Sequence, residues 1–249
     1  YLGDPALPIS FPEKDIKLTT INGVPIAQSN EVLKGLDYVK LGGQVLNANG
    51  ALQSNYNGVL EAKVFDKRVT RQTLGNDGTT INGELAILEF TTLGETLFNG
   101  QATVTNGIFE FDFVVPKDVQ IPIDKGKVSF YSQVDNQLVD NAGFDLDIQI
   151  GGLNENAGTD TTGPILQLFM NDESFVAGGI TNDSPNLIVK LQDGNGINTA
   201  SGIGHDLLAI LDGDEANPFK LNDYYQANVD DYTTGIANYI FRDLEDGPH

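Results

Sequence analysis

Asn-Gly and Asp-Gly pairs recur along the chain, and they constrain its fold more than any other feature of the sequence. Residues of these types tolerate the positive φ angles that two-residue hairpin loops require. The chain contains 23 Asn and 28 Gly, and such pairs stand between short apolar segments at residues 22–23, 49–50, 57–58, 77–78, 82–83, 99–100, 106–107, 193–194, 212–213 and 246–247. Short segments divided by hairpin turns predict an all-β protein.

The clearest predicted hairpin is centred on Asn106 and Gly107. Apolar side chains occupy every second position on both sides of this pair, at Ala102, Val104, Phe109, Phe111, Phe113 and Val115. Alternation with a period of two places one face of each strand against a core and the other face in water. We therefore expect Phe111 to be buried and its neighbour Asp112 to lie on the water-facing side.

About seven such strands are predicted between residues 13 and 150, among them segments 84–90 and 144–150. Seven short strands with frequent turns are typical of an immunoglobulin-like β-sandwich. Four more strand-like segments follow, at residues 164–170, 187–191, 206–211 and 236–241. The predicted fold class is therefore all-β, with two tandem immunoglobulin-like β-sandwich domains.

A segment rich in Gly, Asn and Thr separates the two predicted domains. Residues 151–163 read GGLNENAGTDTTG and hold one large apolar side chain, that of Leu153. Such a segment cannot bury enough apolar surface to offset the entropy lost on ordering. We predict a first sandwich over residues 13–150, a linker over 151–163 and a second sandwich over 164–249.

Charge and composition exclude several classes of function. The formal net charge is −21, of which residues 151–249 carry −13. This charge argues against a general binder of nucleic acid or of anionic membranes, because phosphate contacts need clustered Lys and Arg. No apolar run reaches the roughly 18 residues that a membrane-spanning helix needs.

The chain also lacks the side chains that many catalytic sites require. It has no cysteine, so thiolate nucleophiles, disulfides and zinc–thiolate sites are excluded. Its two histidines are His205 and His249. No Gly-x-Ser-x-Gly elbow accompanies His205, and Asp206 cannot orient the ring by adjacency alone. We therefore assign no catalytic residue.

Short blocks of sequence carry a resemblance that runs along nearly the whole chain in order. The first block, YLGDPAL at residues 1–7, is similar to the stretch that closes the catalytic domain of gingipain-like cysteine peptidases. The later blocks resemble the region that follows the peptidase domain in the PorU-type sortases of the type IX secretion system. They are VFDK (64–67), TLGND (73–77), ATVTNG (102–107), FVVPKD (113–118), LFMND (168–172), NGIN (195–198), GIGHD (202–206), LDG (211–213) and LNDYYQ (221–226).

That resemblance implies a parent protein with cysteine endopeptidase activity at the outer-membrane surface of a Bacteroidetes-type bacterium, where it removes the sorting signal of exported cargo. Residues 1–12 would be the tail of the upstream peptidase domain, and the second sandwich would lack its last strand. The nucleophilic Cys and the catalytic His of the family lie upstream of Tyr1, so this fragment is expected to be non-catalytic.

The same resemblance implies the partners. The region would orient the upstream peptidase domain and would contact proteins of the outer-membrane attachment complex and exported cargo. Neither nucleic acid nor direct membrane insertion is expected, and no cofactor other than a possible calcium ion.

Two acidic loops are candidates for that calcium ion. Oxygen-bearing side chains stand two and three positions apart in each loop, at Asp193, Asn195 and Asn198 and at Asp212, Asp214 and Asn217. Ca²⁺ takes six to eight oxygen ligands, which mobile acidic loops can supply. The same residue types also simply favour turns, so both interpretations stay open.

A carbohydrate-binding or adhesion module is the alternative function. Four tyrosines cluster in the second predicted domain, at positions 224, 225, 232 and 239. Tyrosine rings can stack on sugar rings, but they serve equally well in core packing.

Overall fold

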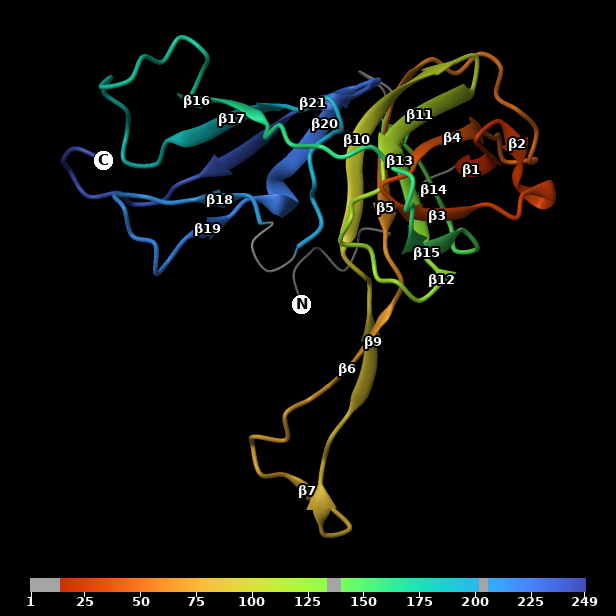
Figure 1. Ribbon diagram of the computed structural model, residues 1–249, viewed down its shortest axis with the longest axis horizontal. Helices are drawn as coiled ribbons and strands as arrows, with labels where there is room; N and C mark the ends of the chain where they lie inside the picture. The colour runs from red at the N-terminus through yellow and green to blue at the C-terminus, as the bar shows by residue number, and fades with distance from the viewer. Residues whose placement is uncertain (1–13, 134–139, 202–205) are drawn as a thin grey trace, which may run out of the picture.

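The computed structural model describes residues 14–133, 140–201 and 206–249 (Figure 1). Within these ranges the chain consists of strands and loops, with two short 3-10 helices at Ile26–Gln28 and Asn222–Tyr224. Neither helix is long and apolar enough to cross a membrane. The predicted all-β class is therefore confirmed.

Seven strands close into a barrel. Along the sheet they follow the order β11-β4-β1-β14-β13-β5-β10, and β10 then pairs back with β11. Their bounds are β1 (Lys14–Ile21), β4 (Tyr38–Val45), β5 (Gly58–Phe65), β10 (Thr96–Thr105), β11 (Ile108–Val114), β13 (Lys127–Gln133) and β14 (Asp140–Asp145). The short β2 (Val24–Pro25) pairs with the end of β1. Closure leaves no free edge within this ring of strands.

The predicted hairpin supplies the closing pair. Asn106 and Gly107 both adopt positive φ, at 54° and 76°, which is the requirement of a two-residue type I′ turn. The strands on either side pair in register, with Val104 opposite Phe109. Phe111 is buried at 4% exposure, as expected, and its ring stacks on that of Phe98 at 5.4 Å between centroids.

The prediction of two tandem immunoglobulin-like sandwiches is wrong. The first region is a closed barrel, and its sheet continues without a break into the second region through the parallel pairing of β10 with β20 (Tyr225–Val229). Sandwich and barrel strands both bury alternate side chains, so the alternation cannot distinguish them. Parallel pairing of β1 with β14, between segments distant in sequence, helps to close the ring, and no local pattern encodes it.

A small three-stranded sheet lies beside the barrel. Its order is β12-β15-β3, from Asp124–Lys125, Gln149–Leu153 and Val32–Gly35. The predicted strand at 144–150 is therefore divided between β14 and β15. Residues 151–153 of the predicted linker extend β15, and the next residue, Asn154, donates its N–H to the Gly35 carbonyl at 2.9 Å.

The second region extends the same sheet by four strands, on the side of β10 that faces away from the barrel (Figure 1). Beyond β20 the order is β21 (Asp231–Ile240), β17 (Asn186–Gln192) and β16 (Ile165–Met170). A separate hairpin of β18 (Leu208–Ala209) and β19 (Phe219–Lys220) accompanies it.

A long hairpin arm projects away from the barrel (Figure 1). It is formed by β6 (Val69–Gln72) paired with β9 (Glu89–Thr92), and by β7 (Thr80–Ile81) paired with β8 (Glu84–Leu85). The prediction that segment 84–90 is a strand of the first sandwich is wrong, because this segment lies in the arm. Its apolar side chains are exposed, as are those nearby, at Leu74, Ile81, Leu85, Ile87, Leu88, Phe90 and Leu93.

Candidate functional site

An apolar cavity of about 790 Å³ lies against the second region of the sheet. The floor of the cavity is one face of β16, β17 and β21, and the other walls come from the segment 207–211, from the loop 178–183 and from the last residues of the chain. The floor residues are Leu166, Leu168, Met170, Leu187, Val189, Leu191 and Ala237. A cavity of this size and character is typical of a binding site.

Strand register explains the apolar floor. Leu166 lies opposite Leu191 and Leu168 lies opposite Val189, and side chains directly opposite each other point to the same face of a sheet. The two β17 residues are buried, whereas Leu166 and Leu168 are 54% and 63% exposed. The floor is thus covered over β17 and open over β16.

Asn222 fixes the wall that covers β17. Its side-chain oxygen accepts the N–H of Leu207 at 3.0 Å, and its amide nitrogen donates to the carbonyl of Thr199 at 3.2 Å. The N–H of Leu221 also donates to the Leu207 carbonyl at 2.7 Å. Asn222 is itself buried, so these bonds anchor the segment that leads into β18.

Carboxylates dominate the charge at the rim of the cavity. Asp183, Asp212, Glu245 and Asp246 line it together with His249. The His249 ring lies 2.8 Å from the Glu245 carbonyl oxygen and 2.9 Å from an Asp212 carboxylate oxygen. Both contacts raise the pKa of His249, the carbonyl contributing most. With four carboxylates and one imidazole, the rim favours a positively charged group.

The residues predicted to bind calcium make hydrogen bonds within turns or with side chains distant in sequence. The Asp193 carboxylate accepts the N–H of Asn195 at 2.8 Å. The Asn198 amide donates to Asp118 at 2.6 Å. Asp212 contacts His249.

Asp214 accepts the N–H of Ala216 at 3.1 Å and the Asn217 amide at 2.8 Å, and the Asn217 bond is the main cause of a lowered pKa at Asp214. Within the described ranges, no group of three or more His, Cys, Asp or Glu side chains is placed to hold a metal ion. Calcium binding by these loops stays a prediction.

The surroundings of His205 are described only in part. His205 and the preceding residues 202–204 lie outside the described residues. The next residue, Asp206, pairs with Lys220 at 3.0 Å, and this contact ties the loop end to β19.

The four tyrosines pack against other rings or into the core. Tyr225 is buried, and Tyr232 lies 6.0 Å from the Tyr38 ring. Tyr224 and Tyr239 meet edge to face with centroids 4.9 Å apart. These contacts are those of core and edge packing, which gives no specific support to a stacking platform for sugars.

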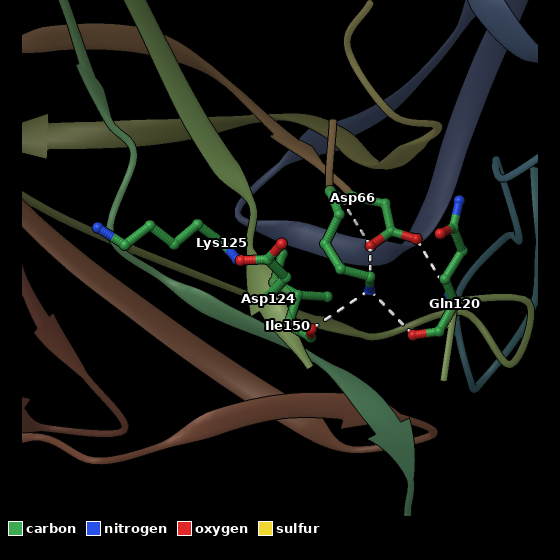
Figure 2. Close-up of polar contacts among 6 residues, drawn as sticks. Asp66, Gln120, Asp124, Lys125 and Ile150 are labelled. Atoms are coloured by element: carbon green, nitrogen blue, oxygen red, sulfur yellow. Dashed lines mark hydrogen bonds and ion pairs between the residues drawn. The ribbon is translucent and has the colours of Figure 1, made fainter. Parts of the chain in front are cut away.

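A buried ion pair at the base of the arm was not found from the sequence. Asp66 and Lys67 are 3% and 5% exposed, and their charged groups are 2.7 Å apart. The Lys67 ammonium also donates to the carbonyls of Gln120 at 2.9 Å and Ile150 at 3.3 Å, while Asp66 accepts the Gln120 N–H at 3.0 Å (Figure 2).

That pair joins three parts of the fold. Its geometry gives no support for a reactive site. All three ammonium hydrogens have acceptors, so the pair serves to join the arm base, the loop at residue 120 and β15. An Asp-Lys dipeptide after a strand is too common to signal burial, because burial here depends on segments more than 50 residues away.

Comparison with known proteins gives an informative similarity among solved structures. No protein-family model matches the chain, and no curated protein matches it. Among solved structures, the chain is similar to the crystal structure of dimeric latent PorU from Porphyromonas gingivalis, with 27% sequence identity and a TM-score of 0.57. The match covers 99% of this chain and 23% of that protein, so the chain corresponds to less than a quarter of PorU and is related in structure to a region of it.

Proposed function

We propose that the chain is a non-catalytic region of a PorU-like, gingipain-type cysteine peptidase of the type IX secretion system. The observation that carries this proposal is the match to PorU over 99% of the chain at 27% identity. The chain has no cysteine, so the nucleophile of such a peptidase would lie elsewhere in a longer protein.

In this proposal the region positions the peptidase and contacts partner proteins at the cell surface. The barrel and the second region share one continuous sheet, which gives the rigidity that a spacer needs. The exposed apolar arm and the open cavity offer surfaces of the kind that bind partners. The upstream peptidase domain, attachment-complex proteins and exported cargo are the partners proposed.

The experiment removes residues 14–249 from the longer protein in the bacterium that makes it. We expect exported cargo to keep its sorting signal or to be released instead of attached, although the peptidase portion is still produced. A matched control carries Ile165→Gln, a substitution at an exposed side chain, and should attach cargo normally.

Two results would contradict the proposal. One is normal cargo attachment in the deletion strain. The other is selective binding of the purified chain to glycans on an array, combined with failure to bind the separately produced peptidase domain, which would favour a carbohydrate-binding module.

A further inference from the structure

We propose that the free edge of β16 and the apolar cavity beside it form a docking site for an extended segment of a partner polypeptide. The segment would carry apolar side chains at alternate positions and a basic residue next to them. This inference rests on the proposed function, in that the region contacts partner proteins, and it identifies the surface and the chemistry of that contact.

Hydrogen bonding between β16 and β17 decides which backbone groups of β16 face outward. The Asn171 N–H donates to the carbonyl of Asn186, directly opposite, at 2.7 Å. In an antiparallel ladder, hydrogen-bonded pairs alternate with non-hydrogen-bonded pairs. Ile165, Gln167 and Phe169 therefore bond to β17, and the residues between them, Leu166, Leu168 and Met170, direct their N–H and carbonyl groups away from the sheet.

That outward edge is available for pairing. β16 is the last strand of the sheet, and no other strand of the described ranges pairs with it. Its Met170 carbonyl accepts the N–H of Asp172 at 2.8 Å, which leaves the backbone groups of Leu166 and Leu168 as the open positions. An edge with free backbone groups is a template for strand addition.

The side chains at the same positions form the open part of the cavity floor. Leu166 and Leu168 are more than half exposed, while Leu191 and Val189 opposite them are buried. A strand added beside β16 would continue the sheet and would place every second side chain on the face that forms this floor, next to Leu166 and Leu168. One extended peptide in a single register can therefore pair with the backbone of β16 and bury apolar side chains against Leu166 and Leu168.

The negative charge of the cavity rim discriminates among classes of ligand. Its carboxylates, at Asp183, Asp212, Glu245 and Asp246, favour a peptide with basic residues and repel fatty acids and anionic phospholipid headgroups. A second copy of the chain would bring an equally acidic rim, from a protein of net charge −21, against the first. A neutral hydrocarbon would fill the cavity but would leave the edge of β16 unpaired.

The test uses the full chain and a nine-residue peptide with valine at every second position, threonine between the valines and lysine at each end. Binding is measured by calorimetry against two substituted chains. Leu168→Gln alters the cavity floor, and Ile165→Gln is the matched control, because Ile165 is exposed to the same degree, at 64% against 63%, but points to the opposite face. We expect Leu168→Gln to weaken binding by roughly tenfold or more and Ile165→Gln to leave it within about twofold.

Two further peptides separate pairing from simple apolar contact. N-methylation at alternate residues removes the donors that a β-ladder needs, and replacement of the terminal lysines by glutamates reverses the charge. Both changes should weaken binding by roughly tenfold. Equal binding of all three peptides, or no binding of any of them, would overturn the proposal.

Other occupants give distinct results, each of which would overturn it. If the unsubstituted chain sediments as a dimer and the Leu168→Gln chain as a monomer, the edge of β16 binds a second copy of the chain. If a detergent with a dodecyl chain binds and the peptide does not displace it, the cavity is a site for a hydrocarbon chain. Binding to the 249-residue chain but not to the longer protein would show that a segment of that protein already covers the site.

The outcome is independent of the cargo-attachment experiment. If the peptide fails to bind while deletion of residues 14–249 still abolishes attachment, only the docking site is refuted. If the peptide binds as expected while the deletion has no effect, the docking site stands and the proposed function fails.

Discussion

At the scale of single residues, the buried pair of Asp66 and Lys67 joins three segments of the chain, so the fold should be sensitive to the loss of either side chain. Removal of one partner leaves the other charge buried without compensation, which costs about 3–5 kcal/mol. We expect Lys67→Met to lower the free energy of unfolding by about that amount, since two carbonyls also lose their donor. Urea denaturation of Lys67→Met, Asp66→Asn and the double variant measures the coupling. Strictly additive losses would show that the two side chains act separately.

Phe111 tests the assignment of barrel faces. Its ring contacts those of Phe98, Phe113 and Phe130, with centroids 5.4–6.4 Å away, so Phe111→Ala should cost about 3–5 kcal/mol of unfolding free energy. The neighbouring Asp112 lies on the outer face and accepts the hydroxyl of Tyr38, which raises the pKa of Tyr38 to about 12. Asp112→Ala should therefore cost less than about 1 kcal/mol while lowering the Tyr38 pKa in an absorbance titration. Equal stability losses for the two variants would contradict the assignment.

At the scale of elements, the hairpin arm is an addition to the barrel that the barrel does not need. Its strands pair with each other, with Val69 opposite Thr92 at the base, and its apolar side chains are exposed. Replacement of residues 70–91 by an Asn-Gly turn should therefore shift the Tm by less than about 3 °C, equivalent to ~1 kcal/mol. Differential scanning calorimetry measures the shift. A loss of more than about 10 °C would show that the arm packs on the barrel in solution.

At the scale of the whole molecule, the seam between β10 and β20 joins the two regions into one folding unit. The Asn99 amide donates to the Tyr225 carbonyl at 2.6 Å, and the Thr103 N–H donates to Asp230 at 2.8 Å. We therefore expect a single cooperative thermal transition.

Gly100 provides the test of that seam. A Cβ atom at Gly100 would lie 2.4 Å from the Phe98 ring and 3.1 Å from the Cβ of Ala227, so Gly100→Val should separate the strands and divide the calorimetric transition into two. Gly194→Ala is the matched control, because no atom lies within 4 Å of the added Cβ. A single, unshifted transition for Gly100→Val would show that the regions do not depend on this pairing.

The strands of the candidate site could be predicted from the sequence, but their arrangement around the cavity could not. The strand-like segments at 164–170, 187–191 and 236–241 were predicted from local alternation, and they form β16, β17 and part of β21. That Leu166 and Leu168 remain uncovered depends on which strand ends the sheet and on where the segment 207–211 lies. The partners of Asp66 and Lys67 likewise come from distant loops, so their burial could not be inferred from neighbouring residues.

The sequence by itself determined the all-β class, the Asn106-Gly107 hairpin and the buried face of β11, because turn chemistry and alternation act between residues close along the chain. It also determined that no cysteine chemistry resides in this chain. Only the tertiary structure decided that seven strands close into a barrel, that β10 carries the sheet into the second region, and that segment 84–90 belongs to an exposed arm. These features depend on pairings between distant strands, and alternate burial is the same whether a strand lies in a sandwich or in a barrel.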